Sequence, residues 1–326
     1  MTYGSKYVNN FLYWEDNTIF CKINPIRHTR TDVTVYCVKI WSERRTVMKK
    51  AIQIPYDENF EKKCKFAREA GFRHISVNFN NTPDPCDATY DKAPALISAI
   101  LEKYDLEAVQ THLFYYYPLL SADKIDAALE HRALREIEVS GKIGAPWCVW
   151  HPRYFKSGEW NTGVFDEEQT VYYNHQTVPR YLEQALKFET GIALENLFGG
   201  MMYGGMDTLA RLCDSFGADH IGICLDTGHA NIDKVDQAAA IAFLGDRIKC
   251  THIHNNWGKY DDHAPPIYGK IEWDKVMAAF AATGYDGPLT LETRCWYATD
   301  DLLRSFAKHN YDCLVYLESL MGSERT

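Results

Sequence analysis

The chain has 326 residues, 46% of them hydrophobic and 24% charged, and its formal net charge at pH 7 is −9. This composition excludes a disordered chain and provides enough apolar mass for one large core. Because Asp and Glu outnumber Lys and Arg by 44 to 35 and no basic run occurs, nucleic acid is a disfavoured partner.

The N-terminus, MTYGSKYVNNFLYWED, has neither the basic start nor the apolar run of a signal peptide, and no membrane-length apolar stretch of about 18 residues occurs. The ten cysteines form no CxxC pair, and Cys148, Cys224 and Cys250 fall within apolar runs. This pattern is typical of reduced core thiols rather than of disulfides or a thiolate metal cluster. We therefore expect a cytoplasmic protein without membrane association.

The first 46 residues differ in pattern from the rest of the chain. DVTVYCVKIWS at 32–42, followed by ERR and TVMKK, predicts a β-hairpin, so we expect residues 1–46 to form an N-terminal extension. Such an edge suits a lid, a docking surface for a partner subunit or a contact in the homo-oligomer that we expect.

From residue 47 onward, short β-rich runs alternate with amphipathic helical segments. Strands are predicted over 46–54, 74–80, 107–113, 147–152, 191–197, 221–229, 248–256 and 288–294. Helices are predicted over 58–72, 92–104, 121–142, 178–189, 206–217, 236–246, 273–284 and 301–320. Four helices are expected to end at a glycine C-cap, namely Gly71, Gly141, Gly217 and Gly284. Eight β/α pairs predict a (β/α)8 TIM barrel over residues 47–326, with a doubly wound sheet as the weaker alternative.

The third to the eighth predicted strands all end in residue types that bind metal ions. These residues are His112, His151, Glu195, Asp226 with His229, His252 with His254, and Glu292. In a barrel the C-terminal strand ends meet on one rim, where catalytic groups lie. A single residue of this kind is typical of a loop cap, but so many buried ionisable groups would repel one another without a cation.

Glu195, Asp226, His252 and Glu292 form an oxygen-rich ligand set with one imidazole. The set suits Mn²⁺, Mg²⁺, Co²⁺ or Zn²⁺, and Mn²⁺ is our first expectation, although the ligand types alone do not choose among them. Such an ion can hold the carbonyl and neighbouring hydroxyl oxygens of a sugar while the C–H between them is deprotonated. Glu195 and Glu292 are then expected to take and return the proton, as in isomerisation or epimerisation.

ALENL, ICLDTGHAN, THIHNNWGKYDDHAPPIYGKIEW and LTLETR resemble, in this order, the xylose isomerase-like TIM barrel superfamily. That superfamily contains sugar isomerases and epimerases and the apurinic endonucleases, and the resemblance covers about residues 47–320. It implies that Glu195, Asp226, His252 and Glu292 are the central metal ligands, and that His229 contacts substrate oxygen.

In the endonuclease branch three zinc ions are held by further residues, and this chain has similar residues at the corresponding positions: His112, His151, His229, Asp261 and His263. The resemblance thus implies a possible second metal site at His229, Asp261 and His263, and keeps a metal-dependent phosphodiesterase as an alternative. The negative net charge favours the sugar enzyme, in which we assign His151 to catalysis and His112 to substrate binding.

The sugar epimerases usually place an arginine a few residues after the seventh-strand histidine, where this chain has NNWGKYDD. Arg294 is the candidate that replaces it, and Trp257 is a further candidate for substrate contact. No Gly-rich phosphate cradle follows the last strands, so a phosphorylated sugar is not favoured over a neutral one.

Aromatic residues are frequent on the same rim, among them Tyr115, Trp150 and Trp296. They motivate a second enzyme interpretation, because the superfamily also includes the large subunits of C-glycoside deglycosylating enzymes. Those proteins act on 3-oxo-glycosides with a small β-rich partner, and proton abstraction there leads to elimination of the aglycone. A barrel that only binds a sugar is the weakest alternative, because it gives the two glutamates no role.

Overall fold

A computed structural model describes most of the chain. The described residues are 48–115, 127–153, 155–157, 164–198, 205–295 and 299–321, together with the backbone of three strands before residue 46. The chain divides into two compact units, residues 1–46 and 47–326. In the first unit β1 (Phe11–Glu15) pairs antiparallel with β2 (Thr18–Lys22), which pairs with β3 (Cys37–Val38). Apart from β3, the hairpin predicted over 32–42 lies outside the described residues, so its role stays a prediction.

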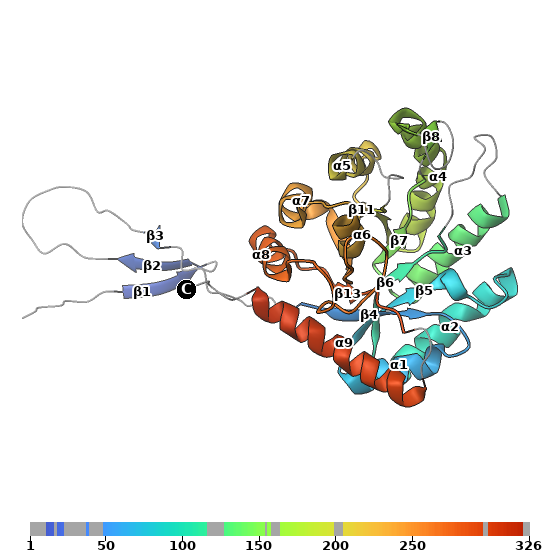
Figure 1. Cartoon of the computed structure of the whole chain (residues 1–326), viewed down its shortest axis with the longest axis horizontal. Coiled ribbons are helices and arrows are strands. Elements are labelled where there is room, and N and C mark those ends of the chain that lie inside the picture. Colours follow the sequence, from blue (N-terminus) through green and yellow to red (C-terminus); the bar gives the residue numbers. More distant parts are fainter. Residues whose placement is uncertain are drawn as a thin grey trace, which may run out of the picture. The chain divides into compact units, whose positions relative to one another are not determined.

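Eight parallel strands of the second unit form a barrel (Figure 1). They are β4 (Lys50–Pro55), β5 (His74–Asn78), β6 (Glu107–His112), β7 (Trp147–Trp150), β10 (Gly191–Glu195), β11 (Ile221–Asp226), β12 (Ile248–His252) and β13 (Leu289–Leu291). Their order is β12-β11-β10-β7-β6-β5-β4-β13, and a parallel bridge between Ile253 and Leu291 joins the two ends. All eight overlap the predicted runs, which confirms the (β/α)8 TIM barrel.

Helices surround the strands (Figure 1). They are α1 (Phe60–Ala70), α2 (Asp87–Tyr104), α3 (Ala127–Lys142), α4 (Glu167–Lys187), α5 (Met206–Ser215), α6 (Thr227–Ile232), α7 (Gln237–Leu244), α8 (Trp273–Thr283) and α9 (Asp300–Leu320). Short elements complete the set: the 3-10 turns η1 (Phe79–Asn81) and η2 (Gly245–Arg247), and the antiparallel pair β8 (Lys156–Ser157) and β9 (Val164–Phe165).

Helix α4 begins well before the predicted start at Val178. Its N-cap is Asp166, whose side chain accepts a hydrogen bond from the Gln169 N–H at 3.0 Å. Pro179, which is typical of a first helical turn, lies inside the helix instead. The predicted start was wrong because the first part of α4 buries the polar residues Thr170, Asn174 and Thr177, which give no apolar pattern at helical spacing.

Three of the four predicted C-cap glycines lie at or just after a helix end with positive φ, namely Gly71, Gly217 and Gly284. Gly141 instead lies inside α3, where a Cβ would overlap the carbonyl oxygen of Phe188. That prediction was wrong because Gly141 serves the close approach of α3 to the end of α4 rather than a turn.

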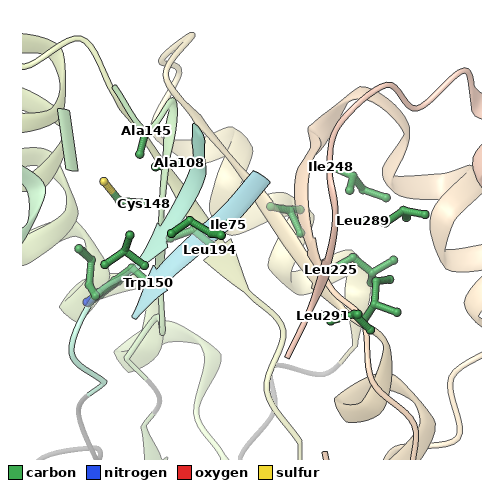
Figure 2. Close-up of a cluster of buried hydrophobic side chains, with 14 of the residues drawn as sticks. Ile75, Ala108, Ala145, Cys148, Trp150, Leu194, Leu225, Ile248, Leu289 and Leu291 are labelled. Carbon is green, nitrogen blue, oxygen red and sulfur yellow. The ribbon is translucent and has the colours of Figure 1, made fainter. Parts of the chain in front are cut away.

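Alternate residues of the strands face the helices or the barrel interior. Trp150, Leu194 and Leu225 belong to the large core (Figure 2), and the Trp150 ring lies edge-on to Tyr181 of α4 at 5.4 Å. A separate small cluster, here called the floor, consists of Val149, Ala193, Cys224 and Cys250. Each floor residue lies two positions before His151, Glu195, Asp226 or His252 and therefore points the same way. Strand alternation thus directs Glu195, Asp226 and His252 into the barrel at its C-terminal end, and His151 follows directly after β7.

The described cysteines are free thiols, and Cys148, Cys224 and Cys250 are buried as predicted. Among the described helices, none has the length and apolar character needed to span a membrane.

Candidate metal centre and active site

A cavity of about 730 Å³ lies over the C-terminal ends of the barrel strands. The predicted site residues on its wall are His112, His151, Glu195, His229, Asp261, His263, Glu292 and Arg294. Asp226 and His252 are completely buried next to them. Trp257 is 55% exposed and is not among the described residues that line the cavity.

The central group consists of Glu195, Asp226, His252 and Glu292, whose ligand atoms all lie within 4.8 Å of one another. The His252 Nδ1 is 3.1 Å from Glu195 Oε1, 3.0 Å from Glu292 Oε2 and 3.8 Å from Asp226 Oδ2. The structure thus brings together the four predicted central metal ligands around a single ring nitrogen.

Electrostatics in this group favour the ionised forms despite burial. Burial lowers the pKa of His252, but the carboxylates of Glu195 and Glu292 outweigh it and raise that pKa well above its usual value. Burial likewise raises the pKa of both glutamates, yet His252 and its neighbours hold each carboxyl below its ordinary range. The protonated imidazole therefore does here what a bound cation would do, which is to balance buried negative charge.

A second group surrounds Asp261, which lies in the loop between β12 and α8. Its Oδ2 is 2.7 Å from His263 Nε2 and 3.6 Å from His229 Nε2. Burial lowers the pKa of His229, but Asp226, Asp261 and Glu195 together raise it to about 10. The three residues predicted to form a second metal site are therefore neighbours.

A third group adjoins the first through Glu195. His112 Nε2 and His151 Nε2 lie 3.3 and 3.0 Å from Glu195 Oε2. Burial lowers the pKa of His151 despite the nearby carboxylate, which favours the neutral imidazole. The Tyr115 ring stacks on His151 with centroids 5.8 Å apart and closes this side of the cavity.

Three histidines are oriented by backbone carbonyl groups. The Nδ1–H groups of His112, His229 and His263 are placed to donate to the carbonyls of Leu113, Asn196 and Glu292 at 2.7, 2.8 and 2.8 Å. When these rings are neutral, this arrangement leaves the Nε2 lone pair of each ring facing the site, as in metal-binding histidines.

An unsatisfied atom of the site also fits a cation. Asp261 Oδ1 is buried and receives no hydrogen bond from any residue that the structure describes. Buried acceptors normally have such partners, and a divalent ion with oxygen and imidazole ligands would provide the missing interaction. The residues present therefore fit one or more divalent ions.

Loop geometry places the residues that follow β11 and β12. Asp226 caps α6, with Oδ1 accepting the His229 N–H at 2.7 Å, and this short helix turns His229 back toward the site. Asn255 and Ala264 form a two-way backbone pair, at 2.8 and 3.0 Å, which returns the intervening loop to the rim with Asp261 and His263 on it. The backbone of His263 has a positive φ of 47°, and its carbonyl oxygen accepts a hydrogen bond from the backbone N–H of Arg294.

Two contributors to the site were not identified from the sequence. Asn196 forms a two-way pair with the Asp226 backbone, at 2.9 and 2.8 Å, and so ties the ends of β10 and β11 together. His254 was noted as a strand-end residue but given no role, although its Nε2 is 3.0 Å from both Asp226 oxygens. The HxH spacing between His252 and His254 is the sequence signal that could have identified it.

Comparison with known proteins places this arrangement in a family. A family model described as xylose isomerase-like TIM barrel matches residues 64–309. The uncharacterized protein y4fM of Sinorhizobium fredii (strain NBRC 101917 / NGR234) is 28% identical over 266 residues, which cover 73% of this chain and 82% of that protein. A probable endonuclease 4 of Mycobacterium bovis (strain BCG / Pasteur 1173P2) is 36% identical over 222 residues, covering 65% of this chain and 81% of that protein.

A similar solved structure is the apo form of the 3-keto-D-glucoside 4-epimerase YcjR from E. coli. It has a TM-score of 0.65 and 17% sequence identity, over 84% of this chain and all of that chain, and so shares the fold. The chain belongs to the xylose isomerase-like TIM barrel family.

Proposed function

We propose that this chain is a divalent-metal-dependent enzyme that moves a proton at the carbon next to a sugar carbonyl, as an isomerase or epimerase. The observation that carries the proposal is the pair Glu195 and Glu292, both on the cavity wall and both within 3.1 Å of His252 Nδ1. Two carboxyl groups at one end of a cavity large enough for a sugar can act on a single substrate carbon, the ionised one as proton acceptor and the protonated one as proton donor.

Glu195, Asp226, His252 and Glu292 would hold the ion, for which we favour Mn²⁺ over Mg²⁺, Co²⁺ or Zn²⁺. When bound, the ion supplies Lewis acidity that stabilises negative charge on the carbonyl oxygen as the neighbouring C–H loses its proton.

The two glutamates carry out the proton transfer. A carboxylate oxygen of one glutamate accepts the proton from the substrate carbon. In isomerisation the same residue returns it to the adjacent carbon, whereas in epimerisation the facing glutamate, entering the cycle protonated, returns a proton from the other side. His151, 3.0 Å from Glu195 Oε2, is placed to exchange protons with it.

The remaining residues on the cavity wall are proposed to bind substrate oxygens. His112, His229 and Arg294 line the cavity next to the glutamates. Trp257 lies outside the described lining, so it would contact only a substrate that extends beyond the cavity. The sugar epimerase YcjR, which has the same fold, supports a carbohydrate substrate.

Phosphodiester hydrolysis is a second candidate, because a specific observation favours it. The groups around His112, around His252 and around Asp261 adjoin one another, and clustered divalent ions can activate water and stabilise a phosphate leaving group. The probable endonuclease 4 at 36% identity also supports this candidate.

Metal counting combined with isotope exchange tests both candidates. Metal content per chain is measured by elemental mass spectrometry on protein purified without added metal. Ketoses and 3-oxo-glycosides are then incubated with the protein in D₂O and followed by NMR. Deuterium at the carbon next to the carbonyl supports the proton-transfer enzyme, and aglycone release identifies elimination. Two or three zinc ions with cleavage of abasic DNA and no exchange would favour hydrolysis, and no metal after reconstitution would contradict both candidates.

A further inference from the structure

His254 lies between the central group and the Asp261 group. The residue is completely buried and follows His252 by two positions. Its Nε2 is 3.0 Å from each carboxylate oxygen of Asp226 and 3.8 Å from Asp261 Oδ1. Its ring stacks on His263 with centroids 4.4 Å apart and an interplanar angle of 18°. A single imidazole therefore contacts residues of both groups.

The chain makes specific room for this ring. A Cβ at Gly228 would overlap the His254 imidazole, including its Nε2. The Thr227 hydroxyl also bonds both backbone groups of His254, accepting its N–H at 3.2 Å and donating to its carbonyl at 3.0 Å. The Thr227–Gly228 turn thus fixes the His254 backbone and leaves the space that its ring fills.

We propose that His254 is a positioning residue that donates from Nε2 to Asp226 and holds this carboxylate in the orientation that a divalent ion requires. The inference rests on the metal-dependent function proposed above. Asp226 Oδ1 also accepts the His229 N–H at 2.7 Å, so the carboxylate is held from two sides. Because its Nε2 donates to Asp226, the His254 ring orients a metal ligand and does not itself bind the ion. Removing a residue that orients a ligand in this way typically weakens metal binding about 10–100-fold.

Mn²⁺ titration of the chelator-stripped full chain, with free Mn²⁺ followed by electron paramagnetic resonance, tests the inference. His254→Leu should raise the dissociation constant about 10–100-fold. His254→Gln keeps a donor of similar reach and should restore most of the affinity. Gly228→Ala should resemble His254→Leu although it retains the imidazole, because the new Cβ displaces the ring from Asp226.

Gly217→Ala is the matched control. Gly217 has φ +58 with no atom within 4 Å of an added Cβ, so alanine there strains the backbone without touching the site. This variant should bind Mn²⁺ like the wild type, and circular dichroism of each metal-free variant verifies folding.

Wild-type affinity in both His254→Leu and Gly228→Ala would overturn the inference. A His254→Gln variant as weak as His254→Leu would also overturn it, because a donor would then not suffice. Failure of the wild type to bind Mn²⁺, Mg²⁺, Co²⁺ or Zn²⁺ would instead refute the proposed metal-dependent function, and this inference with it.

Discussion

A buried charged network ties α3 to the loops that border the cavity, and breaking it should be costly. Glu136 is completely buried, and its carboxylate accepts hydrogen bonds from Tyr90 Oη at 2.8 Å, Arg132 Nε at 2.8 Å and the Phe114 N–H at 2.7 Å. Arg132 also donates to the Phe79 carbonyl at 2.8 Å, and its guanidinium lies over the Phe114 ring. Phe79 directly follows β5, and Phe114 is the second residue after β6.

Replacing Arg132 by Met keeps most of the side-chain stem but removes the positive charge. The Glu136 carboxylate would then remain buried with only two neutral donors. Removing one partner of a buried ion pair costs about 3–5 kcal/mol, and we expect Arg132→Met to lower the free energy of unfolding by that amount. In Arg132→Met/Glu136→Gln no buried charge remains, so the expected loss is smaller, about 1–3 kcal/mol from hydrogen bonds left unmade.

Urea denaturation followed by circular dichroism measures both values. Arg211→Met is the control, because Arg211 pairs with Asp207 and Glu167 at 2.7 and 2.8 Å while all three side chains are largely exposed, and little change is expected. The reasoning is refuted if Arg132→Met loses no more than Arg211→Met, or if the double variant is less stable than Arg132→Met alone.

Substitutions, pH changes and metal addition at the site are expected to affect catalysis, metal binding and stability in different ways. Glu195→Gln and Glu292→Gln should fold and lose about 10²–10⁴-fold in turnover, because an amide cannot accept the substrate proton. Deuterium exchange measured at known metal content checks this, and wild-type exchange would contradict it. The pKa of His229, about 10, exceeds its ordinary 6.5, so protonated His229 stabilises the metal-free fold below pH 6.5 and that contribution disappears as pH rises through 10. Melting temperatures in chelator should therefore fall less over this range for His229→Gln than for the wild type. Adding Mn²⁺ at 100 times its dissociation constant should stabilise the stripped protein by about 2.7 kcal/mol, and an unchanged melting temperature would argue against binding to the folded state.

The barrel strands could be predicted because parallel strands covered on both faces are nearly continuous apolar runs. In β11, all six residues from Ile221 to Asp226 are buried, and the run ends in a carboxylate. Since the C-terminal strand ends of a barrel meet on one rim, His112, Glu195 and Glu292 could be expected near Asp226 without coordinates.

Features that depend on contacts between distant residues could not be predicted in this way. The role of Gly141 depends on Phe188, which belongs to the following β/α unit. The role of His254 depends on Asp226 and on the space left by Gly228, neither of which is adjacent in sequence. The first part of helix α4 buries Thr170, Asn174 and Thr177, whose polar side chains do not show in the apolar pattern. Periodicity reports which face of an element is buried but not what that face contacts.

The floor has a consequence for redesigning this enzyme. Val149, Ala193, Cys224 and Cys250 support the site from within the barrel, whereas the cavity wall is completed by segments that follow the strands. Exchanging residues of those segments other than the site residues that they carry, which include His151, Asp261, His263 and Glu292, should therefore leave the ligand geometry unchanged. Ala193 is completely buried two positions before Glu195, so a larger residue there would shift Glu195 and disturb the ligand geometry. Mutant libraries for new substrate specificity therefore belong in the loops and not in the strands.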